Sequence, residues 1–226
     1  MPFVARSRWV LVTACIAVPA VALVSACSTD NATSPKSVAS ADTVAMDPNS
    51  EVLLDYWINV GSDSGYETSV TGGNGAYVQM FNSGSGSYDD FRLIFQFALP
   101  TLAGRGVVDS ATMYDYACAH STPVIDSIVV DHVNWGAIYH DSATWAGQTL
   151  QANIGTLARD TTTGWKSLSV TSSIQADYAA KRVNSQFRAE WLYSVIPPND
   201  TYIEFGGSNC GAGGNVGPGY LVIWAH

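Results

Sequence analysis

The amino-acid sequence predicts an all-β protein, a jelly-roll-like β-sandwich with one short helix, preceded by a signal peptide and a flexible tether. Short segments in which apolar and polar side chains alternate recur along residues 51–226, and this period of two is that of a half-buried strand. Stretches rich in Gly, Ser and Asn separate these segments. Many short strands with frequent turn residues are typical of sandwiches and barrels.

The clearest strand covers residues 91–99. Apolar side chains occupy its odd positions from Leu93 to Leu99, whereas Arg92 and other even positions fall on the opposite face. Pro100 ends the strand, because proline has no N–H group to donate to a neighbouring strand. Seven further strands are expected, at residues 52–60, 107–119, 125–133, 165–170, 185–195, 202–205 and 220–224.

A single helix of one or two turns is expected at residues 171–181. Thr171 or Ser172 can cap its first turn with a side-chain oxygen. Ile174 and Tyr178 are four residues apart and therefore share one helix face.

The first 26 residues have the pattern of an export signal. Arg6 and Arg8 precede an apolar run over residues 9–26, and small residues stand directly before Cys27. This order is that of a secretory signal, and the small residues before the cysteine resemble a bacterial lipobox. We therefore expect cleavage before Cys27, a lipid on Cys27, and an exported lipoprotein held on a bacterial membrane, at the outer membrane or cell surface. A cleaved secretory signal and a permanent membrane anchor are the alternatives.

Residues 27–50 are expected to form a flexible tether, because they are rich in Ser, Ala, Thr, Asp and Pro and have little to bury. Residues 51–226 are long enough for one sandwich domain. Without residues 1–26 the chain has 8 Lys and Arg against 19 Asp and Glu, a net charge of −11. A charge of this sign argues against nucleic acid as a partner. The basic residues cluster only at Lys181 and Arg182.

The four cysteines predict one disulfide. Cys15 lies in the export signal, and Cys27 is the expected lipidation site, which leaves Cys118 and Cys210. In an oxidising compartment these two are expected to form a disulfide bond. Two buried free thiols are the alternative, and the spacing of the cysteines fits no common metal site.

Several fragments resemble one family in their order along the chain: residues 55–58 (DYWI), 92–100 (RLIFQFALP), 109–113 (DSATM), 134–135, 142–145, 165–174, 187–188 and 220–223. Together they resemble the DNRLRE-type domain, which is grouped with carbohydrate-binding module family 96. The resemblance covers nearly all of residues 51–226. It implies a jelly-roll module on a secreted or surface protein and a polysaccharide ligand, with acidic, alginate-like glycans as the associated class. The acidic chain would repel such a ligand unless a basic patch or a cation intervened.

Sugar rings stack on exposed aromatic faces and are oriented by nearby polar side chains. The candidate ligand-binding residues share the outward faces of predicted strands: Tyr114, Tyr116, His120, Arg188, Glu190, Tyr202 and Glu204. Most other aromatic residues are expected to be core, because aromatic rings dominate the burial energy of a sandwich. This expectation includes Trp145, Trp165, Trp191 and Trp224, whereas Trp57 is left undecided.

Acidic residues suggest two further features. Asp55 and Arg92 lie at matching ends of two of the fragments, and a structural ion pair between them is expected. Loop carboxylates are the usual ligands of Ca²⁺, which is a possible cofactor. The Ca²⁺ candidates are Asp63, within an expected turn at residues 61–65, and Asp89, Asp90 and Asp200, with Asn199 beside the last. Solvated carboxylates without a cation are the alternative.

Little in the sequence predicts an enzyme. It contains no GxSxG or HExxH motif. Asp131 precedes His132 and His140 precedes Asp141, but neighbours in a strand point to opposite faces, so neither pair forms a ready dyad. We therefore expect a non-catalytic, surface-anchored polysaccharide-binding module. The alternative is a structural or adhesive surface protein that uses the same sandwich for protein contacts or self-association.

Overall fold

The computed structural model describes residues 39–45, 52–59, 63–70, 76–82, 88–102, 104–120, 127–135, 148–160, 162–192, 201–206 and 219–226. All of them belong to one unit, Ser37–His226. Among the described residues, no helix has both the length and the apolar composition needed to cross a bilayer.

The elements are β1 (Ser40–Ala45), β2 (Val52–Asn59), β3 (Asp63–Val70), β4 (Ala76–Asn82), β5 (Tyr88–Ala98), β6 (Val108–His120), β7 (Ser127–Asn134), β8 (Gln148–Ala158), β9 (Gly164–Ser169), α2 (Thr171–Ala179), β10 (Asn184–Leu192), β11 (Thr201–Phe205) and β12 (Tyr220–Ala225). The expected all-β sandwich with one short helix is thereby confirmed.

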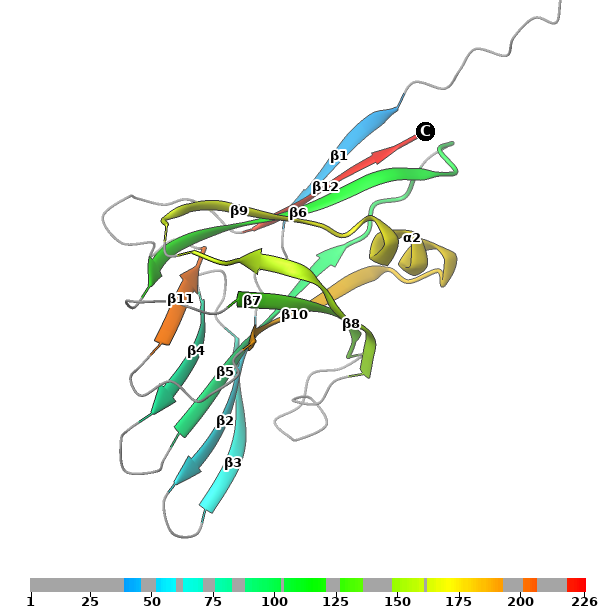
Figure 1. Ribbon diagram of the computed structural model, residues 1–226. Coiled ribbons are helices and arrows are strands. Elements are labelled where there is room, and N and C mark those ends of the chain that lie inside the picture. Colours follow the sequence, from blue (N-terminus) through cyan, green and yellow to red (C-terminus); the bar gives the residue numbers. More distant parts are fainter. Residues whose placement is uncertain are drawn as a thin grey trace, which may run out of the picture. The chain divides into compact units, whose positions relative to one another are not determined.

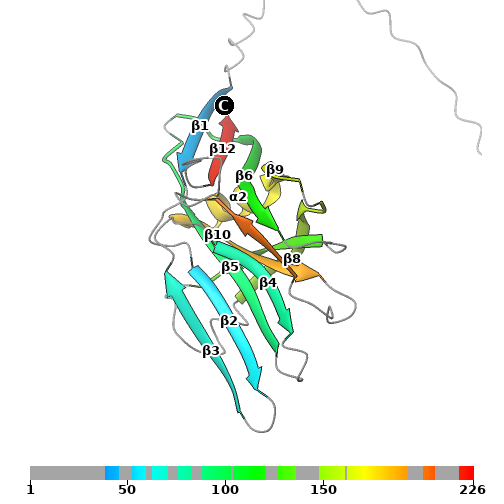
Figure 2. The ribbon, with the colours of Figure 1, turned by 90° about the vertical axis from the view of Figure 1, so that its left-hand side faces the viewer.

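The strands form two antiparallel sheets. In one sheet, β6 lies between β12 and β9, and β1 pairs with the outer side of β12 (Figure 1). In the other, β5 pairs with β2, β4 and β10, and β7 and β8 continue from β10. β11 pairs with both β6 and β4 and so joins the two sheets. The hairpin of β2 and β3 continues the second sheet beyond β5 (Figure 2).

The core lies between the inward faces of the two sheets. β5, β6, β10 and β12 place alternate residues there, all of them almost completely buried: Leu93, Phe95, Phe97, Ala111, Met113, Phe187, Ala189, Leu221 and Ile223. The rings of Phe95, Phe97 and Phe187 lie 6.1–6.4 Å apart by their centroids. Aromatic pairs at this distance add about 0.5–1.5 kcal/mol each beyond the burial of their surface.

Helix α2 packs against β6 and β10 in a way that differs from its predicted capping. The N-cap position is Val170, and no side chain caps the helix. The Thr171 hydroxyl instead accepts a hydrogen bond from the Ala111 amide at 2.9 Å, so it joins the start of the helix to β6. The prediction for the helix face holds, because Ile174 is fully buried and Tyr178 packs against the core.

The first strand was not expected, because residues 40–45 fall within the predicted tether. β1 pairs with β12 along its whole length. Arg105 also holds β1, because it donates to the Asp42 carboxylate at 2.5 Å and to the Ser40 hydroxyl at 2.6 Å. The ordered domain therefore begins before residue 51. β1 is an exposed edge strand with little apolar surface, so its sequence gives no alternating signal.

Three other strands, β3, β4 and β8, were also missed. In β8 the pairing with β7 shifts register at several points, and Asn153 has a φ of +47°, so the apolar period is broken. Asp63 begins β3 and is not a turn residue. Asp89 and Asp90 lie inside β5 and are not loop residues, as the calcium hypothesis had assumed.

Candidate functional site

Five aromatic side chains gather on the outward side of the sheet formed by β1, β12, β6 and β9. We call this set the aromatic face: Tyr114 and Tyr116 of β6, Trp165 of β9, and Tyr220 and Trp224 of β12. The strand register brings them together, because Tyr220 lies opposite Tyr114 and Trp165 lies opposite Tyr116. Residues that are directly opposite in an antiparallel pair share one face of the sheet.

Four of these rings form a contiguous cluster. Tyr114 and Tyr220 are stacked, with centroids 4.9 Å apart and planes 17° apart. Trp165 forms T-shaped contacts with Tyr220 and Tyr116, with ring centroids 5.1 Å and 5.4 Å apart. Each ring is thus held in place by its neighbours, and such contacts stabilise defined ring orientations. The cluster is a preformed aromatic surface.

Trp165 and Trp224 are the most open members of the aromatic face, with 45% and 46% of their surface exposed. The prediction that both belong to the core is therefore wrong. On β12 the core positions are taken by Leu221 and Ile223, so the alternation directs Trp224 outward. Trp191 is buried, as predicted, and Trp145 lies outside the described residues.

Small hydroxyl-bearing residues surround the aromatic rings. Ser110 and Thr112 continue the outward row of β6, and Ser167 and Ser169 continue that of β9. In the register, Ser167 lies opposite Tyr114, and Ser169 lies opposite Thr112. Hydroxyl groups both donate and accept hydrogen bonds, so this face offers polar partners beside apolar stacking surfaces.

The other predicted ligand residues are spread over several elements. Tyr114 and Tyr116 lie on the aromatic face, as expected. Tyr202 and Glu204 are half-buried on one face of β11, and the alternate residues Ile203 and Phe205 are buried on its other face. For His120 the structure describes only the backbone, which pairs with Ile203.

Arg188 was expected to be exposed, and this prediction is wrong. Only 5% of its surface is exposed, and its guanidinium forms a buried salt bridge with Asp131 of β7. It also approaches Glu190 at 3.5 Å. Asp131 lies directly opposite Arg188 in the pairing of β10 with β7, so the guanidinium meets a carboxylate on its own face of the sheet. Arg188 therefore has a structural role here.

The same ion-pair network continues onto β5. Arg92 donates to Glu190 at 2.9 Å and to Asp90 at 3.4 Å. Burial raises the pKa of the Asp90 carboxyl to about 6, although the Arg92 charge opposes this change. The Asp55 side chain is outside the described part of the structure. In the register residue 55 pairs with Phe91, next to Arg92, and its ion pair with Arg92 remains a prediction.

The calcium hypothesis gains no support from the described residues. There, no three His, Cys, Asp or Glu side chains gather closely enough to hold a metal ion. Burial raises the pKa of Asp89, and Asp90 is paired with Arg92. Of the remaining candidates, Asp63 has no described side chain, and Asn199 and Asp200 lie outside the described ranges.

A buried cluster that the sequence did not reveal joins α2 to β7. His132 Nε2 lies 3.0 Å from both carboxylate oxygens of Asp177, and Arg182 donates to Asp177 at 2.5 Å. Asp177 and His132 are 0% and 2% exposed. Asp131, the sequence neighbour of His132, points to the other face and binds Arg188, so the predicted separation of this pair is confirmed. The cluster anchors the helix, with His132 and Asp177 closed to solvent and the Arg182 side chain 28% exposed.

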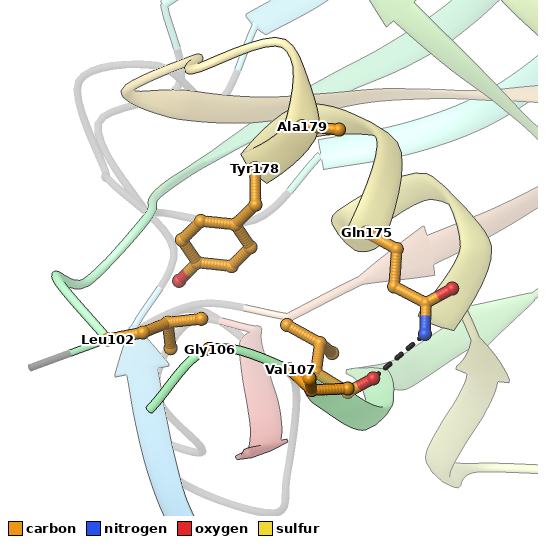
Figure 3. A pocket seen from close by; sticks show the side chains of 7 residues that line it. Leu102, Gly106, Val107, Gln175, Tyr178 and Ala179 are labelled. Atoms are coloured by element: carbon orange, nitrogen blue, oxygen red, sulfur yellow. Dashed lines mark hydrogen bonds between the residues drawn. The ribbon is translucent and has the colours of Figure 1, made fainter. Parts of the chain in front are cut away.

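Two shallow cavities of about 330 Å³ each lie away from the aromatic face. In the first, Tyr178 and Gln175 point from α2 toward the segment at residues 102–108 (Figure 3). Both polar groups are used internally, because Tyr178 donates to the Pro100 carbonyl and Gln175 donates to the Val108 carbonyl, each at 2.8 Å. The second is lined by Asn134, Lys181, Arg182, Val183, Asn184 and Gln186, and contains the basic pair noted in the sequence.

Cys118 continues the outward row of β6 and takes part in a disulfide bond. Its predicted partner, Cys210, and the predicted lipidation site, Cys27, lie outside the described residues, so both assignments remain predictions. No protein-family model matches the chain, and no curated protein matches it.

Proposed function

We propose that this protein is a non-catalytic, polysaccharide-binding module that contacts its ligand through the aromatic face. The observation that carries the proposal is the position of Trp165 and Trp224, which stand half-exposed on one side of a sheet whose other side is core. Solvent-exposed aromatic clusters on a folded domain commonly mark a binding surface.

The chemistry of the aromatic face suits a sugar. The C–H groups on one side of a pyranose ring are weakly positive and apolar, and the face of an aromatic ring is electron-rich. The hydroxyl groups of Thr112, Ser167 and Ser169 lie on the same side of the sheet. Such an arrangement supports stacking with hydrogen bonds at its rim, as in ligand sites that combine apolar walls with a few polar groups.

Export and lipid anchoring at Cys27 complete the proposal. Since β1 begins at Ser40, a linker of about twelve residues would separate the lipid from the domain, with a reach of at most about 40 Å. The module would thus act close to the membrane that carries it. Membrane contact occurs through the lipid only, and Ca²⁺ is not required for stacking.

The second candidate is a structural or adhesive surface protein, and the edge strand β1 favours it. The side of β1 that faces away from β12 has no partner strand among the described residues. Exposed strand edges can pair with another chain. Under this alternative, light scattering of the purified protein would detect assemblies at micromolar concentration, whereas a binding module would be monomeric.

The test of the proposed function is retention by insoluble polysaccharides. The chain with Cys27→Ser, which cannot be lipidated, is exported, purified and mixed with a panel of polysaccharides. We expect retention by at least one polymer and reduced retention of Trp165→Ala and Trp224→Ala. Leu192→Ala is the matched control, because Leu192 is 53% exposed but lies on β10. Failure to bind any polymer, with or without Ca²⁺, would remove the proposal.

A further inference from the structure

The regularly paired outward positions of the sheet that carries the aromatic face are free of charge. At the bulge beside Trp224, the exposed carboxylate of Asp109 lies 2.7 Å from a ring nitrogen of His226. On β1, β12, β6 and β9 the regularly paired outward positions hold only small, hydroxyl-bearing, apolar or aromatic residues and one cysteine: Ala41, Thr43, Ala45, Tyr220, Val222, Trp224, Ser110, Thr112, Tyr114, Tyr116, Cys118, Trp165, Ser167 and Ser169. This is unusual in a chain with 10 basic and 19 acidic residues. Exposed sheet faces normally carry charged side chains.

Charged residues do occur on the same strands, but they occupy the alternate positions. Asp42 pairs with Arg105 at 2.5 Å, and Lys166 pairs with Asp160 at 2.5 Å. Asp115 is 2% exposed and accepts a hydrogen bond from the Tyr116 amide. Asp42, Lys166 and Asp115 thus belong to the opposite side of the alternation, and each is paired or buried. The aromatic face therefore offers no lysine or arginine to an acidic sugar, and the exposed Asp109 carboxylate beside Trp224 would repel one.

The aromatic rings are placed in two groups along β6. The four-ring cluster lies around Tyr114 and Tyr116, and Trp224 lies opposite Ser110, four residues from Tyr114 and six from Tyr116 on the same strand. Four to six residues of a strand span about 13–20 Å. Trp224 has no aromatic ring contact among the described residues, and Thr112 and Val222 separate it from the cluster. A ligand that stacks on both groups must therefore be a chain of several sugar units.

From these observations we infer that the ligand is a neutral polysaccharide whose chain lies along β6, stacked on Trp165 at one end and on Trp224 at the other. The inference rests on the proposed function and specifies its ligand class. It departs from the acidic glycans that the family resemblance implies. An acidic chain would need a basic surface, and in the described part of the molecule the two adjacent basic residues, Lys181 and Arg182, line the separate shallow cavity beyond α2.

The first experiment compares neutral and acidic polymers with the Cys27→Ser chain. Hydroxyethyl cellulose, xylan, galactomannan and dextran are the neutral probes, and alginate and polygalacturonate are the acidic ones. We expect binding to at least one neutral polymer and to neither acidic polymer. Raising the salt concentration from 0.05 to about 0.5 M should leave the neutral interaction unchanged, because no ion pair is involved.

The second experiment uses oligosaccharides of increasing length from the polymer that binds. Affinity should increase with length until the chain reaches both Trp165 and Trp224, and then level off. Trp165→Ala and Trp224→Ala should each weaken binding of the long ligand about tenfold, as removal of an aromatic anchor does. Trp224→Ala should leave the affinity for the shortest bound ligand unchanged. Trp165→Phe should keep part of the affinity, because it keeps a stacking surface, and unchanged thermal unfolding would show that the variants are folded.

The two proposals fail in different ways. Binding of alginate or polygalacturonate that is lost in Lys181→Ala and kept in Trp165→Ala would overturn the neutral-ligand inference and leave a polysaccharide-binding module. An affinity that does not depend on ligand length, or that Trp224→Ala does not change, would overturn the proposed chain path. No binding to any polymer would overturn the proposed function itself.

Discussion

The buried carboxylate of Asp90 should destabilise the protein at neutral pH, so that Asp90→Asn increases its stability. Asp90 is 5% exposed, and burial raises the pKa of its carboxyl from 3.8 to about 6. The neighbouring Arg92 favours the charged form but does not compensate for the lost hydration. A difference of about two pH units corresponds to about 3 kcal/mol. The free energy of unfolding at pH 7.5 should therefore increase by up to about 3 kcal/mol in the Asn variant.

The increase in the pKa of Asp90 also fixes how the stability of the protein changes with pH. Between pH 3.8 and about 6 the folded state keeps the Asp90 proton, whereas the unfolded state has lost it. This contribution to stability is thus fully present below pH 3.8 and is lost as the pH rises through about 6. Urea denaturation of the wild type and Asp90→Asn at pH 4, 5, 6 and 7.5 measures it. The difference in stability between the two proteins should grow across this range.

The control is Asp160, an exposed carboxylate whose pKa is lowered by hydrogen bonds from Lys166 and Thr162. Asp160→Asn should not change the pH dependence of the unfolding free energy above about pH 5, because this carboxylate is ionised there in both the folded and the unfolded state. If the free energy of unfolding changes equally with pH in the wild type and in Asp90→Asn, the reasoning is refuted. So would a less stable Asn variant at pH 7.5, since the attraction between Asp90 and Arg92 would then exceed the cost of burial.

Three further changes test other parts of the molecule. Asp177→Ala should lower the free energy of unfolding by about 3–5 kcal/mol in urea titrations, because it leaves the buried His132 and the half-buried Arg182 without their carboxylate; a loss below about 1 kcal/mol would contradict this. Cys118→Ala should lower the Tm by several degrees, since a disulfide that closes a loop of about 90 residues contributes roughly 4 kcal/mol; mass spectrometry of the intact protein should identify Cys210 as the partner. Cys27→Ser should release the protein from membranes on fractionation, and an unchanged membrane fraction would exclude lipidation at this residue.

The core of the sandwich could be predicted from the sequence because alternation and burial coincide there. Leu93, Phe95 and Phe97 were assigned to one face of a strand, and all three are at most 1% exposed. The outward assignment of Tyr202 and Glu204 implies that the alternate residues of β11, Ile203 and Phe205, face inward, and both are at most 1% exposed. In these strands one side faces the core and the other does not, so apolar and polar residues alternate along the sequence.

The strands that were missed lack such a contrast between their two sides. β1 has no strongly apolar side chain except Val44, which packs against the core. Its pairing with β12 and the contact with Arg105 hold the rest of the strand in the sheet. In β8 the register shifts interrupt the alternation. These strands are ordered by partners that are distant in sequence, and local periodicity does not report such pairings.

The charged side of β10 shows a second limit of prediction from the alternation of residue types. Alternation correctly separated Arg188 and Glu190 from Phe187, but it does not tell whether the second side is exposed. In the structure Arg188 is buried against Asp131. The partner lies on another strand, 57 residues away, and no local signal could have supplied it. Likewise, the link between His132 and Asp177 depends on where the helix packs.

On the outward sides of the two sheets the usual distribution of polarity is reversed, because charged residues are buried on one and apolar rings are exposed on the other. Asp90, Asp131 and Arg188 are charged and buried, whereas Trp165 and Trp224 are apolar and half-exposed. Each exposed half of a tryptophan leaves roughly 100 Å² of surface in water, which corresponds to roughly 2–3 kcal/mol that folding does not recover. A ligand that covers both rings would recover part of this free energy on binding. The buried ion pairs offer no such gain, because their charges already neutralise one another, and a ligand would have to break them. The aromatic face is therefore the side of the molecule where binding is physically most favourable.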